Sequence, residues 1–340
     1  MILFYIALII LVFVGAHRRP AASVWCSKES AAAIKGFFML TVFLAHAFDY
    51  TLKGGLAECS FLDRAGFTVR SGLGQLIVVM FLFFSGYGVA LSFKSKGFDY
   101  LKRYPKTRLV YTILNFDVAV MMFFVVTMVL GGEVSLVKLI KSLLAWDSMG
   151  NSNWYIFTII ICYLAHYLLM RLQVKRWFFM IGAYFIITQI MAQVRPNWWY
   201  NTMLAYPLGA IFADKKDYAA KVLDKHYWLT MTILLFCFFV PYIFRYDYNG
   251  IAHNVMGCLF SLIVVVVMYR YEISGHFLTW VGGNIFPIYI YQRLPMLLLS
   301  VVLGKSFCHE HSLFFVTISA AIVCAIVFLY PKFKIGGKYL

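Results

Sequence analysis

Charged residues are scarce in this chain, and acidic residues are the scarcest. Only 13% of its 340 residues are charged, and 14 aspartates and glutamates stand against 30 lysines and arginines. A soluble domain of this length needs a polar surface, so this composition excludes one. The seven cysteines follow no metal-binding or disulfide spacing. A bridge between Cys59 and Cys308, which fall in loops on the same expected side of a membrane, stays open.

Long apolar runs make up much of the sequence. The chain is 63% hydrophobic and 19% aromatic, with a mean hydropathy of +0.81. Because the runs are long and do not alternate, they indicate helices rather than a barrel. The sequence predicts an all-α, polytopic integral membrane bundle of about 10–11 transmembrane helices. The expected spans are, in chain order, 1–16, 32–52, 73–93, 108–130, 154–170, 177–193, 199–213, 227–244, 251–269, 277–303 and 312–330.

The basic residues gather in alternate loops. The net charge of +16 is therefore explained by the rule that positive loops face the cytoplasm, and no nucleic-acid motif is visible. This pattern predicts a plasma (inner) membrane protein with its N-terminus outside and its C-terminus in the cytoplasm. It places Lys35 near the cytoplasmic surface and His46 deeper, towards the outer half. Residues 133–146 are expected to form a short amphipathic helix on the outer face.

Three ionisable residues share one face of the second expected span, AAAIKGFFMLTVFLAHAFDY. Lys35 and His46 are eleven positions apart, or close to three helical turns and about 16 Å along the axis. Asp49 lies three residues further on. Ionisable groups inside a span are costly and mark function, so His46 is a candidate general base, with Asp49 holding its imidazole. The structural alternative is a histidine bonded across helices for packing.

The basic and small-residue segments leave alternatives open. Lys35 either snorkels to head groups or binds a phosphate. The run KSKGFDYLKRYPKTR contacts anionic lipid, or it binds a cofactor's phosphates with Arg103 and Arg108 as forked donors. Ser85, Gly86 and Tyr87, in the run SGYG, serve close helix packing or a helix break that exposes backbone to a ligand.

Further polar residues fall inside expected spans. Asp117 and Arg293 are the costly ones, and they either pair with each other or line a cavity. The neutral ones are Asn115, Gln189, Asn284 and Gln292. The run from Cys308 to His311 has the wrong spacing for a zinc site, so no metal is predicted.

Several segments together resemble the membrane-bound acyltransferase family 3, which includes bacterial glycan O-acetyltransferases. IKGFFMLTVFLAHAF resembles the family's opening span, in which a basic residue precedes a histidine by the same interval, and FLFFSGYGV resembles its FF-x-x-SGY signature. KRYPKTR, NWYIFTIIICYL, AYPLGAIF and WVGGNIFPIYIYQRLPM are similar to later family segments. The resemblance runs from about Ser27 to Val302.

The resemblance implies acyl transfer from a cytoplasmic acyl-CoA, above all acetyl-CoA, to a hydroxyl of a cell-surface or envelope glycan. His46 and Asp49 would be catalytic, and whether His46 is itself acylated stays open. The donor would be bound by Lys35, Ser85, Gly86, Tyr87, Arg103 and Arg108. The acceptor side and the oxyanion would involve Asn284, Tyr289, Arg293 and Asp117. The expected partners are acyl-CoA, a polysaccharide acceptor, the lipid bilayer and a second copy of the chain.

The chain departs from the family pattern in three places. An extra span precedes the family's first helix, which divides the chain into 1–26 (that span and a cytoplasmic loop) and 27–340 (the acyltransferase-like domain). Lys35 replaces an arginine, so forked phosphate binding becomes a point-charge contact. Gln292 stands where many members have histidine.

Two other functions compete with acyl transfer. A transporter or exporter of a glycan or small molecule would use His46, Asp49, Asp117 and Arg293 to relay protons or hold its substrate. A lipid-linked glycosyltransferase would use Glu58 and Asp63 as its acids. Binding of acetyl-CoA argues against the first, and a metal requirement would favour the second.

Overall fold

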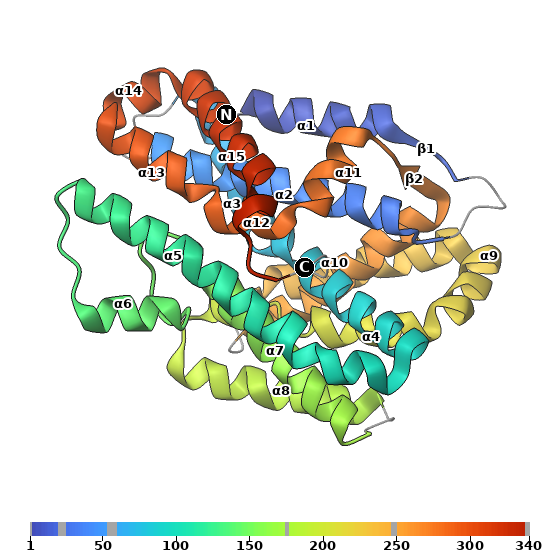
Figure 1. The fold of residues 1–340 in the computed structure, drawn as a ribbon. Coiled ribbons are helices and arrows are strands. Elements are labelled where there is room, and N and C mark those ends of the chain that lie inside the picture. Colours follow the sequence, from blue (N-terminus) through green and yellow to red (C-terminus); the bar gives the residue numbers. More distant parts are fainter. Residues whose placement is uncertain (1, 20–24, 53–59, 174–176, 246–249, 337–340) are drawn as a thin grey trace.

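Nearly all of the described part of the chain is helical (Figure 1). The computed structural model describes residues 2–19, 25–52, 60–173, 177–245 and 250–336. The first half contains α1 (Ile2–Gly15), α2 (Lys28–Thr51), α3 (Phe61–Leu73), α4 (Leu76–Tyr104), the π-helix η2 (Pro105–Val110), α5 (Tyr111–Val129), α6 (Leu136–Leu143) and α7 (Trp154–Arg171). The second half contains α8 (Trp177–Val194), the 3₁₀ turn η3 (Asn197–Trp199), α9 (Ala205–Ile243), α10 (Ile251–Arg270), α11 (His276–Gly283), α12 (Ile285–Tyr291), α13 (Arg293–Val302), α14 (Lys305–Glu310) and α15 (Ser312–Phe333).

The structure confirms a polytopic helical membrane bundle. Among the described residues, 8 helical stretches are long and apolar enough to cross a bilayer. The expected spans 199–213 and 227–244 belong to one region, in which η3 and a turn lead into α9, and α9 kinks at His226. The apolar helix α1 has 14 residues, about 21 Å, which is shorter than a typical hydrocarbon core of about 30 Å.

The expected span 277–303 is broken into α11, α12 and α13. Gly282, Gly283 and Asn284 end the first piece, because glycine is a poor helix former and the Asn284 side chain donates to the Trp280 carbonyl over 2.9 Å. Pro295 has no N–H to give the carbonyl of Tyr291, which weakens the join between the next two pieces. Broken helices of this kind expose backbone where protein surrounds them.

The amphipathic helix predicted within 133–146 is present as α6. The hydroxyl of Ser135 caps it by accepting the N–H of Lys138 over 3.2 Å. Leu136, Ile140 and Leu144 are exposed, as expected for an apolar face that meets lipid.

Two close helix pairs form the centre of the bundle: α4 with α9, and α2 with α11. A Cβ on Gly86 would collide with the carbonyl oxygen of Tyr206, and one on Gly209 with that of Phe83. The α2–α11 pair has the same arrangement, with Gly36 against Leu278 and Gly282 against Ala32. Small residues thus let these backbones touch.

Substituting Gly86 with alanine is expected to destabilise the protein by at least about 2 kcal/mol, because the new methyl meets rigid backbone. In detergent, the apparent melting temperature should fall by about 5 °C or more. Gly88→Ala is the matched control in the same helix, since nothing lies within 4 Å of its added Cβ. Equal melting temperatures for the two variants would refute the close-packing interpretation of Gly86.

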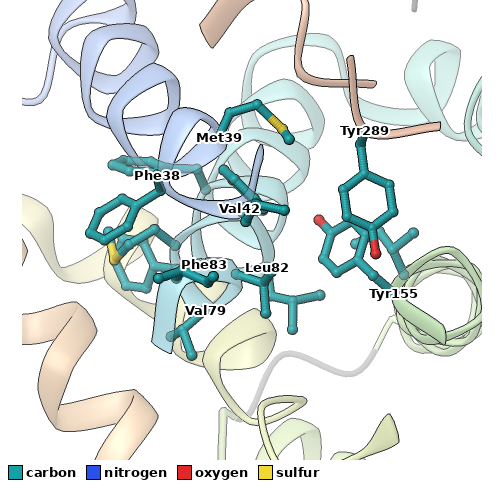
Figure 2. Packing of buried hydrophobic residues seen from close by; sticks show 14 of the residues in the cluster. Phe38, Met39, Val42, Val79, Leu82, Phe83, Tyr155 and Tyr289 are labelled. Carbon is teal, nitrogen blue, oxygen red and sulfur yellow. The ribbon is translucent and has the colours of Figure 1, made fainter. Parts of the chain in front are cut away.

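Buried hydrophobic side chains also fill the space between α2 and α4. Phe38, Met39 and Val42 from α2 meet Val79 and Leu82 from α4, with Tyr155 and Tyr289 beside them (Figure 2). Met39, Val79 and Leu82 are 0% exposed. This wall fixes the two helices that supply most of the residues discussed below.

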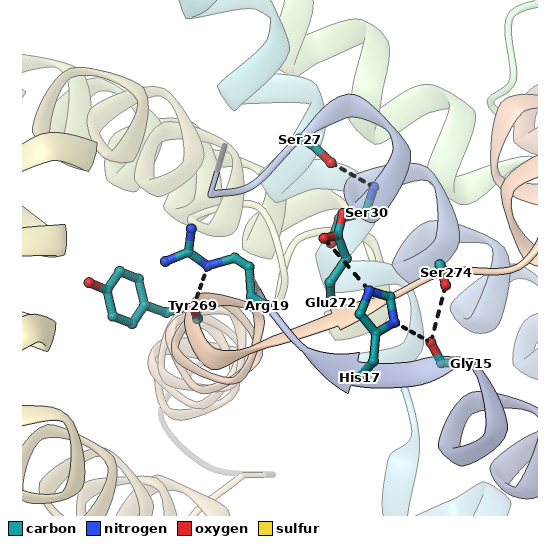
Figure 3. A network of polar contacts seen from close by, with 8 residues as sticks. All are labelled: Gly15, His17, Arg19, Ser27, Ser30, Tyr269, Glu272 and Ser274. Atoms are coloured by element: carbon teal, nitrogen blue, oxygen red, sulfur yellow. Dashed lines mark hydrogen bonds and ion pairs between the residues drawn. The ribbon is translucent and has the colours of Figure 1, made fainter. Parts of the chain in front are cut away.

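A two-stranded antiparallel sheet, which the sequence did not predict, ties the N-terminal segment to the bundle (Figure 3). Strand β1 (Ala16–Arg18) pairs with β2 (Tyr271–Ile273), which lies between α10 and α11. Beyond the strands, Arg19 donates from Nε to the Tyr269 carbonyl over 2.7 Å. The strands are three residues long, too short to give a period-2 signal in the sequence.

Candidate active site

A first cavity of about 340 Å³ lies between α2, α4, η2, α7 and the broken helices α11 and α12. Two cations line it, Lys35 from α2 and Arg108 from η2. Ser85, Thr112, Tyr155, Tyr163 and Tyr289 add hydroxyl groups, and the rest of the wall is apolar. We call this space the basic cavity.

The positive charge of the basic cavity is uncompensated. No acidic residue lines it, and neither Lys35 nor Arg108 has a recorded ion pair within the described ranges. The buried Nε of Arg108 also has no hydrogen-bond partner there. Because two like charges facing one partly enclosed space are unfavourable unless an opposite charge joins them, the cavity is suited to an anion.

A π-helical turn positions Arg108. The chain passes from α4 to α5 through η2 without leaving helical geometry, and π turns are frequent at functional sites. Tyr104, just before η2, is fully buried, and its hydroxyl donates to the Tyr163 carbonyl over 3.2 Å. The Arg108 guanidinium carbon lies 5.9 Å from the Tyr163 ring centroid. Contacts to α7 therefore hold both ends of this turn.

A second cavity of about 320 Å³ contains the candidate base. His46 and Asp49 from α2 line it, together with Arg70 from α3 and the indole rings of Trp154 and Trp198. We call it the histidine cavity.

The polar contacts in the histidine cavity differ from those expected. Nε2 of His46 lies 3.2 Å from the Ser152 hydroxyl. The Asp49 carboxylate forms an ion pair with Arg70, whose Nε also donates to the Ala45 carbonyl over 3.2 Å. Ser152 therefore orients the imidazole of His46. Asp49, which was expected to hold that ring, pairs with Arg70 instead.

Tyr289 is the residue that the basic and histidine cavities share. Its side chain is 2% exposed, and its ring centroid lies 5.1 Å from that of Tyr155. Figure 2 shows the two rings next to each other, and their planes are tilted by 58°. Ser152 lies within interaction range of the Tyr289 hydroxyl, and that hydroxyl makes no hydrogen bond of good geometry in the described structure. A hydroxyl donor without a partner therefore stands where the two cavities meet.

The structure brings some of the expected donor residues together and separates others. Lys35, Ser85 and Arg108 line the basic cavity, whereas Gly86, Tyr87 and Arg103 do not. Gly86 packs against α9, the Tyr87 ring packs against Phe212 with centroids 5.7 Å apart, and Arg103 is exposed.

The expected acceptor residues are also dispersed. Of the four, only Tyr289 lines either cavity. Asn284 bonds within its own turn, and the Arg293 guanidinium lies 5.7 Å from the Tyr50 ring centroid. Asp117 lies in a separate, largely apolar cavity of about 650 Å³ on α5. No Asp117–Arg293 ion pair is recorded among the described side chains.

Gln292, in the position where many family members have histidine, is fully buried. Its Nε2 donates weakly to the Tyr289 carbonyl over 3.4 Å, and its Oε1 has no partner within the described ranges. Its contact is therefore with the backbone of the residue that both cavities share.

Sequence reasoning missed Arg70, Ser152 and Trp198 as parts of the site. Arg70 was visible only as a basic residue on the basic-poor side, in a segment without an expected helix. Ser152 lies in the polar turn before α7, and only the fold brings it to a histidine 106 positions away. No local pattern signals such a contact.

The remaining alternatives fall outside these cavities. Cys308 is a buried free thiol, while Cys59 and Glu58 lie outside the described residues. In the part of the chain that the structure describes, no three histidine, cysteine or acidic side chains form a metal-binding group.

The comparisons with known proteins identify the family of the chain. The model of the acyltransferase domain, family 3, matches residues 30–330. Searches of curated proteins and of solved structures gave no match. The matched range begins in α2 and ends in α15, and it includes every residue that lines the two cavities. The chain therefore belongs to acyltransferase family 3.

Proposed function

We propose that this membrane acyltransferase moves an acyl group, acetyl foremost, from cytoplasmic acyl-CoA to a hydroxyl of a cell-surface or envelope polysaccharide. One observation carries the proposal: a cavity with two uncompensated cations and a cavity with a histidine meet at Tyr289. A thioester donor with several phosphates fits the first cavity, and an alcohol that must lose a proton fits the second.

On the donor side, Lys35 and Arg108 bind phosphate groups of the coenzyme. The slim pantetheine arm extends along Ser85 and Tyr155 and presents the thioester carbonyl next to Tyr289. The excess of basic residues in the loops near Arg108 supports a cytoplasmic position for this end, with the N-terminus outside and the C-terminus inside.

On the acceptor side, His46 removes the proton of the sugar hydroxyl as the oxygen attacks the carbonyl carbon. Ser152 holds the ring in place, and the Asp49–Arg70 pair lies along the wall of the same cavity. The Tyr289 hydroxyl donates to the tetrahedral oxyanion. The carbon–sulfur bond then breaks, and the leaving thiolate takes the proton from His46. A variant route through acyl-His46 would need the same unprotonated ring.

The test is mass analysis of surface polysaccharide from cells with and without the protein. Loss of an acyl mass, restored by the wild-type chain and not by His46→Ala, is the expected result. An unchanged acylation pattern would remove this acceptor class from consideration.

A further inference from the structure

A third cavity, of about 200 Å³, adjoins the histidine cavity. The two share the wall formed by Ser71, Gly74, Gln75 and Trp198. The rest of the third cavity comes from the end of α3, the segment that begins with η3, the end of the α9 region and the start of α10, including Asn201, Arg245, His253 and Met256. It is therefore an adjacent chamber on the acceptor side, and none of its lining residues lines the basic cavity.

Three polar side chains in the wall of this chamber carry hydrogen-bond acceptor atoms that are not used within the described structure. Asn201 is 5% exposed, and its Oδ1 has no partner in the described structure. Nδ1 of His253 lies 3.2 Å from the Asn201 carbonyl, which can only accept, so Nδ1 bears the proton and Nε2 of the neutral ring is an acceptor. Gln75 donates its Nε2 to the Trp198 carbonyl over 2.8 Å, which leaves its Oε1 to accept.

Among its described lining residues, the chamber also has a flat apolar surface and no acidic side chain. The Trp198 side chain is 48% exposed, although it lies in a wall. Its neighbour Trp199 is buried, with the Arg195 guanidinium 4.2 Å from its ring, so the turn that presents Trp198 is fixed. Arg245 also lines the chamber, but it donates to the Tyr242 carbonyl over 2.7 Å and lies 4.3 Å from the Tyr242 ring centroid.

We infer that this chamber is a second sugar subsite, which binds the unit next to the one that receives the acyl group. Acceptor atoms recognise the O–H donors of a sugar, and a buried acceptor without a partner is unfavourable until such a donor arrives. An indole face packs against the apolar C–H face of a sugar ring. The inference rests on the proposed function and specifies its substrate: a chain of at least two units, the second of them uncharged.

Transfer rates to acceptors of different length test the inference. The probes are one-, two- and three-unit fragments of the deacylated surface polysaccharide, with acetyl-CoA and the purified full-length protein. We expect kcat/KM to rise about tenfold or more from one unit to two, and little from two to three. Asn201→Ala should lower kcat/KM for the two-unit fragment about tenfold, as expected for the loss of one buried hydrogen bond. It should leave kcat/KM for the one-unit fragment unchanged. Met256→Leu, a volume-conserving change in the same wall, is the matched control.

A second variant covers the case in which Asn201→Ala does not fold. Met256 is 2% exposed, and Met256→Phe should fill the chamber and lower transfer to two units only. Equal rates for one and two units in the wild type, or equal losses for both lengths in either variant, would overturn the subsite. Calorimetry with acetyl-CoA on the same samples distinguishes failure of the proposed function from failure of the subsite. No binding defeats the proposed function itself, whereas binding without a length preference defeats only the subsite.

Discussion

Acyl transfer should fall by at least about 10²–10⁴-fold when His46 is replaced by alanine. Among the described residues that line the histidine cavity, the imidazole is the only side-chain base that is not already in an ion pair, since Asp49 is bound to Arg70. Without it, the sugar hydroxyl keeps its proton and attacks poorly. The measurement is the initial rate of coenzyme A release in the presence of deacylated polysaccharide.

Two controls separate loss of chemistry from loss of fold. His46→Ala should bind acetyl-CoA as the wild type does, because His46 does not line the basic cavity. His17→Ala alters a histidine that is half exposed on β1 and lines neither cavity, and it should leave the rate unchanged. A His46→Ala protein that keeps more than a tenth of the wild-type rate would end the assignment of His46 as the base.

Removing both cations of the basic cavity should weaken acetyl-CoA binding by about 100-fold or more. A hydrogen bond to a charged group contributes about 1.5–3 kcal/mol, so each of Lys35→Ala and Arg108→Ala should raise Kd at least about tenfold. Lys35→Arg should keep most of the affinity, since either side chain meets a phosphate. Isothermal titration calorimetry on detergent-purified protein gives these values directly.

The exposed basic residues nearby supply the comparison. Lys102 is 80% exposed and lies 3.9 Å from Asp99, and Lys102→Ala changes the net charge equally without touching the cavity. Its Kd should stay within about threefold of the wild type, because exposed charges are screened by salt. An unchanged Kd in the Lys35→Ala, Arg108→Ala double variant would mean that the donor binds elsewhere.

Most of the membrane bundle was predictable from the sequence, because apolar runs long enough for a bilayer have few other solutions. The exceptions are informative. The expected span 277–303 is apolar on the whole, yet it is divided into three short helices with breaks at Asn284 and Gln292. Hydropathy measures partition into lipid, whereas breaks depend on backbone groups that neighbouring helices must satisfy.

The site was predictable along one helix and not across helices. Helical phase placed Lys35, His46 and Asp49 on one side of α2, and all three line cavities. The partners of His46 and Asp49 come from α3 and from the turn before α7, positions that only tertiary packing decides. Arg103 and Arg108 looked equivalent in the basic run, but the π-helical turn between α4 and α5 directs only Arg108 inward.

Among the described residues, Tyr289 alone lines both the basic cavity and the histidine cavity. This has a consequence for how such an enzyme can work. If donor and acceptor approach Tyr289 from opposite leaflets, neither molecule has to enter the other's compartment. Only the acyl group then passes from the donor cavity to the acceptor cavity. The bundle therefore needs no rocking motion between inward-open and outward-open states. A bundle that stays closed between the two cavities would also prevent ions and protons from leaking through the bilayer during turnover.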